Sequence, residues 1–305
     1  MEKHRKKLIK NAAVFDGHSG GLAQGKKIVI EDDIVTEITA DEVSEENFDE
    51  VFDGTGMVAM PGMTDAHVHM GCLFAKGEFP VDYATVPTVT KCKDALMAGF
   101  TTFRDAGSVS EGLKLAFDEG VLPGPRIYPC GAYISQMCGH GDSEYAHTCR
   151  DIQYRHPSST VLADGVPEII RAVREQFYRG ASHIKLMATE ILNRHEDIRL
   201  LFGTDMMITG PDYQVEQSED IRYYEKRFGT MRALRALTGT ANEVFALTTY
   251  QNPYPKGKIG VLEAGSYADL LLVDGDPTKR VSVLADTDHL RLIMKGGTVY
   301  KNTLC

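Results

Sequence analysis

Several features that define particular protein classes are missing from this 305-residue sequence. No apolar run approaches the roughly 18 residues of a membrane-spanning helix, so we expect no membrane segment. The basic start, MEKHRKKLIKNAAVFDG, lacks the apolar stretch of a signal peptide. Basic residues are too few to balance the acidic ones, and the net charge of -10 argues against nucleic acid or an anionic membrane as a partner. The sequence therefore predicts a cytoplasmic protein.

Cysteine motifs are also missing. The sequence has 6 cysteines, but none form a CxxC pair or the spacing of a metal ribbon. An even number is compatible with disulfides, yet the chain is not a short secreted one, so we favour reduced thiols. Apolar content of 43% and charged content of 25% are ordinary for a soluble globular protein. The length suggests one large domain and one small domain.

The pattern of expected secondary structure changes twice along the chain. Residues 8–60 alternate short β-like runs with turns, including an expected hairpin formed by residues 26–30 and 34–38. The same style returns from Lys256 to the end. We therefore expect residues 1–60 and 256–305 to pair as one composite β domain, with residues 61–255 as a separate α/β domain.

The middle of the chain alternates expected strands with expected helices. Such alternation indicates βαβ units and a parallel sheet, most often a barrel when active-site residues follow the strands. The strands are expected at residues 100–104, 126–133, 183–187 and 200–202, and the helices at 90–98, 111–119, 169–178, 222–237 and 241–247.

The stretch MPGMTDAHVHM, residues 60–70, carries the strongest chemical signal. It reads as a turn at Pro61 and Gly62 followed by a short strand. Residues two apart in a strand point to the same face, so His67 and His69 are expected to lie side by side. Two neutral imidazoles on one face make half of a site for Zn²⁺ or a similar metal, although two histidines can also share a strand by chance.

With Asp65 two residues ahead of the first histidine, this stretch resembles the opening metal-binding strand of the metal-dependent amidohydrolase superfamily. GFTTFRDAG (99–107), CGHGD (138–142) and ADLLLVDGDP (268–277) are similar to further family motifs. They point to its imidazolonepropionase-like and prolidase-like (Xaa-Pro dipeptidase) branch. The resemblance implies a TIM-barrel-like α/β hydrolase domain plus a small β-sandwich domain built from both termini.

Three more residues gain roles from this resemblance. Lys185 matches the lysine that ends the fourth barrel strand, which CO₂ often converts to a carbamate that bridges two metal ions. Asp205 matches the aspartate after the eighth strand, which binds metal and accepts a proton from the attacking water. His140 matches a loop histidine that faces the substrate. The alternatives are a lysine whose stem is buried while its amine reaches solvent, an N-cap aspartate and a solvated loop histidine.

The sequence departs from the family pattern between Lys185 and Asp205. Residues 186–204 are too few for even one further βα unit, which needs about 30 residues. Residues 61–250 are likewise shorter than the about 250 residues of a usual (β/α)₈ barrel. Strands five to seven are therefore missing from an incomplete barrel, together with the two metal-binding histidines of strands five and six. His183 and His195 are weak candidates to replace them.

Two functional hypotheses follow. The resemblance implies a metal-dependent hydrolase that cleaves a carbon–nitrogen bond of a small molecule, such as a dipeptide or an acylated amino acid. Its metal site would use His67, His69, Lys185 and Asp205, with Asp205 also catalytic. The cofactor would be one or two ions of zinc or another divalent transition metal, with a CO₂-derived carbamate on Lys185. A homo-oligomer is compatible with the sequence. The second hypothesis is a truncated family member with impaired or no activity.

Overall fold

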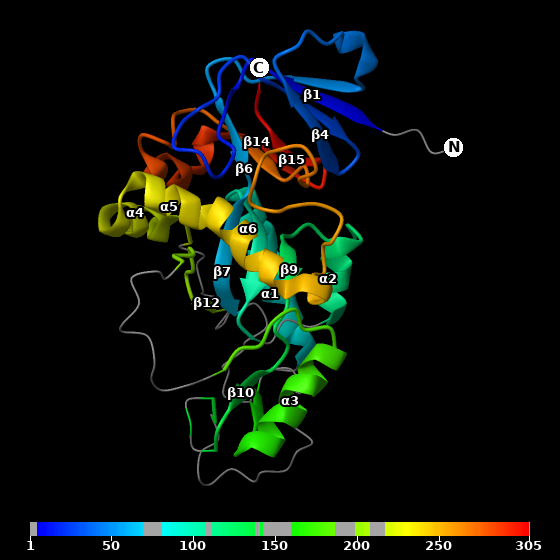
Figure 1. Cartoon of the computed structure of the whole chain (residues 1–305), viewed down its shortest axis with the longest axis vertical. Coiled ribbons are helices and arrows are strands. Elements are labelled where there is room, and N and C mark those ends of the chain that lie inside the picture. The colour runs from blue at the N-terminus through cyan, green and yellow to red at the C-terminus, as the bar shows by residue number, and fades with distance from the viewer. Residues whose placement is uncertain are drawn as a thin grey trace.

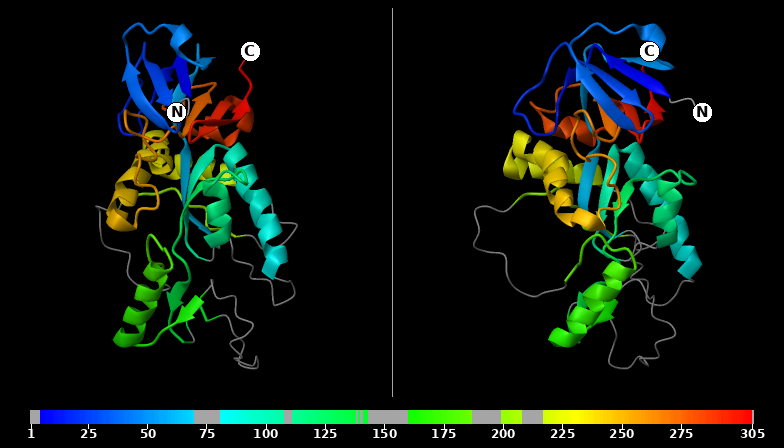
Figure 2. Two further views of the ribbon diagram at one scale, coloured as in Figure 1. Left: turned by 90° about the vertical axis from the view of Figure 1, so that its right-hand side faces the viewer. Right: turned by 45° about the vertical axis from the view of Figure 1, so that its right-hand side comes forward.

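In the computed structural model, described residues are 5–69, 81–107, 111–137, 139, 141–142, 160–186, 199–207 and 217–304. Two terminal β-sheets lie at one end of the molecule, a parallel sheet with helices lies in the middle, and helix α3 lies at the far end (Figures 1 and 2). The first and last described residues lie near the terminal sheets (Figure 1). Among the described helices, none has both the length and the apolar character needed to cross a membrane.

The first terminal sheet is built from N-terminal strands alone. It has the order β4-β3-β1-β5, in which only the β1 and β5 pair is parallel. Its strands are β1 (Lys6–Lys10), β3 (Lys27–Glu31), β4 (Ile34–Thr39) and β5 (Glu50–Asp53), and η1 (Glu45–Asn47) precedes β5. The expected hairpin is confirmed, because β3 and β4 pair antiparallel.

The second terminal sheet joins the two ends of the chain. Its order is β15-β14-β13-β6-β2, and β6 pairs antiparallel with β13 although about 200 residues separate them in the sequence. Its strands are β2 (Ala13–Val14), β6 (Val58–Pro61), β13 (Leu270–Val273), β14 (Leu290–Lys295) and β15 (Thr298–Asn302). Side chains from both sheets, such as Ile28 and Leu272, form one apolar core. The domain boundaries stay a prediction.

The central sheet is parallel and has the order β12-β7-β8-β9. Its strands are β7 (Met63–His69), β8 (Phe100–Asp105), β9 (Arg126–Tyr128) and β12 (Met206–Met207). A smaller parallel pair, β10 (Tyr133–Ser135) and β11 (Thr160–Leu162), lies beyond it. No closed barrel forms within the described residues. The architecture is therefore mixed α/β with an open sheet.

Helices surround the sheets, and several of them share an apolar core with the central sheet. They are α1 (Val81–Met97), α2 (Glu111–Asp118), α3 (Val166–Tyr178), α4 (Gln217–Phe228), α5 (Thr230–Leu237), α6 (Gly239–Phe245) and the 3₁₀ segments η3 (Ala246–Gln251), η4 (Val281–Ala285) and η5 (Thr287–His289). The core they share with the sheet contains Phe100, Phe202 and Leu234, and it extends to Leu271 of β13. The α/β part and the terminal sheets thus pack against each other.

Three expected elements differ from those observed. The strand expected at 126–133 is two strands, β9 and β10, because Pro129 lacks an amide hydrogen and Gly131 has a φ of 69°. The helix expected at 222–237 is divided into α4 and α5 at Gly229, whose φ is 81°. The strand expected at 183–187 is not a named strand: within residues 183–186, only Leu186 forms a β-bridge, to Ile134 of β10.

The α/β part and the terminal sheets are joined by a buried ion pair. Arg126 of β9 donates two hydrogen bonds to Asp269, at 2.7 and 3.2 Å, and 3% of the Asp269 side chain is exposed. The guanidinium carbon lies 3.9 Å from the centre of the Tyr267 ring, and the Gly296 amide also donates to Asp269.

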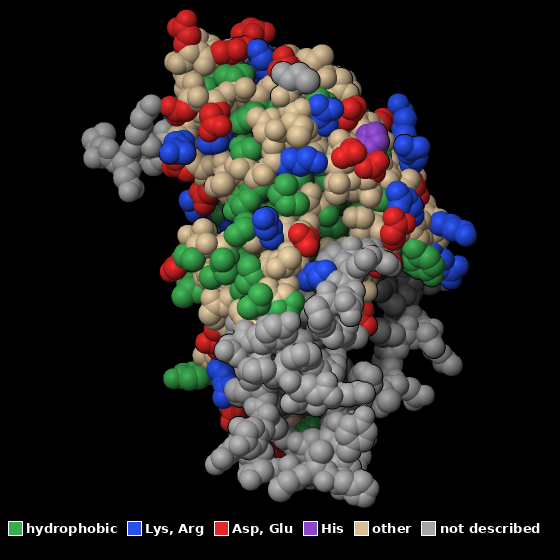
Figure 3. All heavy atoms as spheres, turned by 180° about the vertical axis from the view of Figure 1, so that it is seen from behind, with side chains coloured by type: hydrophobic (Ala, Val, Ile, Leu, Met, Phe, Trp, Pro, Cys, Tyr) green, Lys and Arg blue, Asp and Glu red, His purple; other side chains and the backbone are tan. Residues whose placement is uncertain are grey.

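Seen from behind, hydrophobic side chains gather in the middle of the molecule, while acidic ones are frequent around its upper end (Figure 3).

Candidate metal centre

Strand β7 presents two histidines at its carboxyl end. His67 and His69 are two residues apart, and their ring centroids are separated by 5.4 Å. The Nε2 atoms of both rings lie 3.3 Å from Oδ1 of Asp205. The shared face that period-two geometry predicts is therefore confirmed. His69 is the more enclosed, with 5% of its side chain exposed against 41% for His67.

Asp205 reaches the histidines from the segment that precedes β12. Met206 and Met207 pair with Val68 and His69 of β7, and the Asp205 amide donates to the His67 carbonyl at 2.8 Å. Asp205 has a φ of 56°, which is the left-handed region and unusual for a residue other than glycine. The strand expected at 200–202 is wrong, because the named strand here begins at Met206. The aspartate nevertheless lies where the prediction placed it, beside the histidines.

Lys185 also lies beside His67. Its Nζ atom is 3.1 Å from Nε2 of His67, and its carbonyl accepts a hydrogen bond from the Ile134 amide of β10. The segment is also tied to β9, because the Ser182 amide donates to the Pro129 carbonyl. The segment around Lys185 therefore continues the parallel arrangement beyond β9. The expected proximity of Lys185 to His67 is confirmed.

Burial controls the charge of this group of side chains. Removal from water is the largest influence on both histidines and lowers their pKa values, that of His69 to about 4. The pKa of Lys185 is also lowered, first by burial, with nearby Arg104 acting in the same direction. At neutral pH the rings are therefore neutral, which is the form that binds metal ions.

The three side chains fit a metal ion. One ligand atom from each of His67, His69 and Asp205 lies within 4.8 Å of the others. Two imidazole nitrogens with one carboxylate oxygen are donors that zinc and other divalent transition metals accept. Within the described residues, no second group of three such side chains is found. The arrangement is a candidate site for one metal ion with three protein ligands.

Within the described residues, the remaining candidate, His183, does not join this group. His183 is half-buried, and its ring nitrogens lie 3.0 Å from the Asp105 carbonyl and 3.0 Å from the Ser182 hydroxyl. Both nitrogens are therefore engaged, and burial lowers the pKa of His183 to about 3. His140 and His195 lie outside the described residues.

Two partners of the site were not found by sequence reasoning. Thr204 and Gln217 both donate hydrogen bonds to the buried carboxylate of Asp65, and burial raises the pKa of Asp65 to about 6. Thr204 could have been suspected because it precedes Asp205. Gln217, the first residue of α4, has no local signal that connects it to β7.

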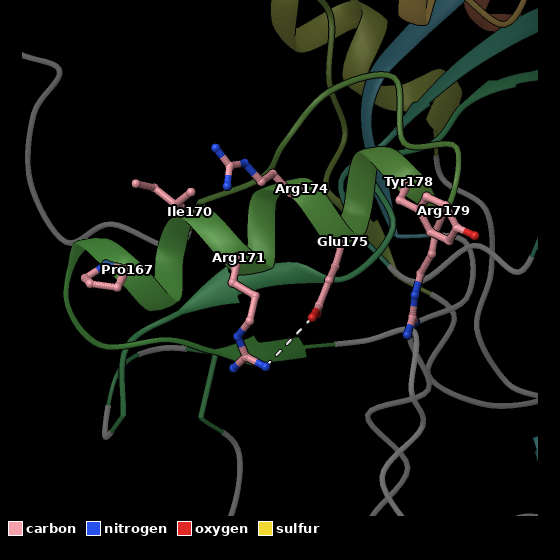
Figure 4. A pocket seen from close by; sticks show the side chains of 7 residues that line it. All are labelled: Pro167, Ile170, Arg171, Arg174, Glu175, Tyr178 and Arg179. Atoms are coloured by element: carbon pink, nitrogen blue, oxygen red, sulfur yellow. Dashed lines mark ion pairs between the residues drawn. The ribbon is translucent and has the colours of Figure 1, made fainter.

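A surface hollow on α3 is separate from the metal ligands. Figure 4 shows its side chains along one face of the helix, with an ion pair of 3.8 Å between Arg171 and Glu175. The hollow is lined by Pro167, Ile170, Arg171, Arg174, Glu175, Tyr178 and Arg179. None of these residues is a candidate ligand, so the hollow contributes no group to the metal site.

Gly203 allows the close approach of the Asp205 segment to β7. A Cβ atom at this position would lie 2.8 Å from the Cβ of His67, closer than normal contact. We expect Gly203→Ala to displace His67 and to weaken Zn²⁺ binding about tenfold or more, measured by calorimetric titration, since small misplacements of site residues are costly. Gly112→Ala on α2 is the control, because no atom lies within 4 Å of its added Cβ. Equal Zn²⁺ affinity in both variants would contradict the expectation.

Part of the chain resembles a known protein family. The model of the amidohydrolase family matches residues 58–197, which include His67, His69 and Lys185. Residues 58–197, a little under half of the chain, are thus similar to the amidohydrolase family. Ochratoxinase of Aspergillus niger, a curated relative, is 34% identical over 152 residues, which cover 43% of this chain and 31% of the relative. The chain thus matches about a third of that relative's length.

Solved structures of amidohydrolases share the fold. An amidohydrolase crystal structure aligns with a TM-score of 0.84 at 22% identity, covering 98% of this chain and 100% of that chain. A prolidase complexed with N-methylphosphonate-L-proline aligns with a TM-score of 0.82 at 21% identity, covering 97% and 100%. The mixed α/β fold is therefore that of the amidohydrolases, although the central sheet is open in the described residues.

Proposed function

We propose that this chain is a metal-dependent hydrolase that cleaves a carbon–nitrogen bond in a small amide, such as a dipeptide or an acylated amino acid. The observation that carries the proposal is the convergence of two histidine Nε2 atoms, each 3.3 Å from the Asp205 carboxylate. The family match of residues 58–197 and the likeness to ochratoxinase and to a prolidase with a bound proline analogue support the reaction and the substrate class. The proposed fold is an incomplete TIM-like barrel beside a β-sandwich.

The three ligands would hold one ion of zinc or another divalent transition metal. Such an ion polarises the substrate carbonyl and lowers the pKa of water, which is the chemistry it supplies when bound. His67 and His69 are neutral and offer lone pairs, while strand β7 fixes their spacing. Asp205 has the more exposed side chain, at 66%, so its carboxylate can accept the proton of the attacking water and return it to the leaving nitrogen.

Lys185 would add a negative charge to the site after modification. Its amine can attack CO₂, forming an N–C bond and releasing one proton, which yields a carbamate anion beside His67. Burial favours the neutral amine that this reaction needs, since it lowers the pKa of Lys185. We expect a carbamate resonance in the ¹³C NMR spectrum of protein equilibrated with ¹³C-labelled bicarbonate. The resonance should be absent from Lys185→Gln, and its presence there would refute the assignment.

A second candidate function is that of a family member with weak or no activity. Within the described residues, no further group of ligands could hold a second ion, and the central sheet is open. An open site admits water, and a misplacement of about 1 Å costs on the order of a hundredfold in rate. We therefore expect slow turnover compared with a relative that has a complete barrel.

Metal loading with a substrate panel tests the proposal. Metal-free protein is titrated with Zn²⁺, and amino acid release is followed from Xaa-Pro dipeptides and N-acyl amino acids. We expect about one ion per chain, bound weakly enough for chelators to remove it, and slow release that stops on chelation and resumes on addition of Zn²⁺. Zinc binding without any turnover would favour the inactive candidate. Absence of zinc binding would refute the metal site, and two tightly held ions with rapid turnover would refute the one-ion assignment.

A further inference from the structure

Asp65 occupies the interior of the molecule directly behind the candidate ligands. It is fully buried on β7, two residues before His67. Its carboxylate accepts four hydrogen bonds, and all four come from neutral donors. Oδ1 accepts from the amides of His67 at 3.1 Å and Thr204 at 3.3 Å, and Oδ2 accepts from the Thr204 hydroxyl at 2.7 Å and the Gln217 amide group at 2.5 Å.

These hydrogen bonds connect three separate parts of the chain. His67 belongs to β7, Gln217 begins α4, and Thr204 lies immediately before Asp205. Thr204 donates two of the four bonds, through its amide and its hydroxyl. The carboxylate therefore holds the backbone on both sides of the site, next to His67 and next to Asp205.

The backbone conformation of Asp205 has to be stabilised by its surroundings. Its φ of 56° is a conformation that residues other than glycine adopt at a cost, and such conformations persist only where the surroundings fix them. The Asp205 amide bonds the His67 carbonyl on one side, while Asp65 fixes Thr204 on the other. Release of Thr204 would let Asp205 relax away from the two histidine nitrogens.

We propose that Asp65 is a positioning residue, whose bonds to Thr204 hold Asp205 in the conformation that faces His67 and His69. The inference rests on the proposed metal site and concerns how that site is held. Gln217 supports the same carboxylate from α4, and Tyr224 of this helix also accepts a hydrogen bond from the Gly203 amide, next to Thr204. Neither Asp65 nor Thr204 would touch the metal ion or the substrate.

Matched threonine variants test this role. Thr204→Val keeps the shape of the side chain and removes the hydroxyl, whereas Thr204→Ser restores the hydroxyl. Thr238→Val is the control, because Thr238 is a buried threonine whose hydroxyl bonds the Leu234 carbonyl four residues earlier rather than Asp65. Asp65→Asn is the fourth variant, since its amide nitrogen would face a donor. Zn²⁺ dissociation constants are measured by calorimetry, and folding of the metal-free proteins is measured by urea unfolding.

We expect Thr204→Val and Asp65→Asn to weaken Zn²⁺ binding by about 10- to 100-fold, the range found for residues that orient metal ligands. Thr204→Ser should bind within about threefold of the wild type. Thr238→Val should lower the urea midpoint without changing the Zn²⁺ affinity. Unchanged affinity in Thr204→Val, or equal losses in the valine and serine variants, would overturn the positioning role while the proposed function stands. A wild-type protein that binds no Zn²⁺ would overturn both.

Discussion

Replacing His69 by asparagine is expected to weaken zinc binding about a hundredfold. If the about 10–16 kcal/mol of a four-ligand zinc site is shared equally, each ligand contributes roughly 3 kcal/mol, a factor of about one hundred in affinity. His69 is buried, and its Nδ1 has no hydrogen-bond partner among the described residues, so the substitution removes little besides the ligand. The Zn²⁺ dissociation constant should rise about a hundredfold, and the rise in melting temperature caused by zinc should disappear.

His18→Asn is the matched control for this substitution. His18 is exposed and belongs to the loop after β2, away from the metal ligands. Its replacement should leave zinc affinity and the zinc-induced thermal shift at wild-type values. If His69→Asn bound zinc as well as His18→Asn, the histidines of β7 would not be ligands.

Replacing Asp269 by alanine is expected to cause the largest loss of stability. The substitution leaves the guanidinium of Arg126 buried without its carboxylate, and it also removes the acceptor of the Gly296 amide. Breaking a buried pair in this way costs about 3–5 kcal/mol, because an uncompensated charge stays in the interior. Since domains of this kind are stable by only about 5–15 kcal/mol, the urea midpoint should fall substantially.

An exposed ion pair provides the comparison for Asp269→Ala. Glu175 pairs with Arg171 on the surface of α3 at 3.8 Å, with about half of its side chain exposed. Glu175→Ala should change the free energy of unfolding by less than about 1 kcal/mol, because exposed pairs contribute little. Similar losses in the two variants would show that the Arg126–Asp269 pair does not join the terminal sheets to the central sheet.

Local patterns were sufficient for much of the fold. The hairpin of β3 and β4 follows from two apolar runs around a turn. The shared face of His67 and His69 follows from the period of a strand alone. Family resemblance, rather than periodicity, placed Lys185 and Asp205 beside them. Where one local rule decides the geometry, the sequence is a reliable guide.

Long-range bonds explain what the sequence could not supply. The segment before Asp205 was expected to be a strand, but its conformation depends on the Asp65 carboxylate and the His67 carbonyl, which are distant in the sequence. The link from Gln217 to Asp65 spans 152 residues and leaves no periodic trace. By contrast, the break between α4 and α5 at Gly229 could have been anticipated from the glycine itself.

The separation of the site's contacts along the chain has a consequence for folding. The bonds that assemble the site join residues 118, 139 and 152 positions apart. Closing such large loops is entropically unfavourable, and contacts of this kind form slowly. A nascent chain therefore acquires its ligand geometry only after α4 has emerged from the ribosome and docked. Until then the bond from Gln217 to Asp65 is missing, so the carboxylate that holds Thr204 beside Asp205 lacks one of its donors.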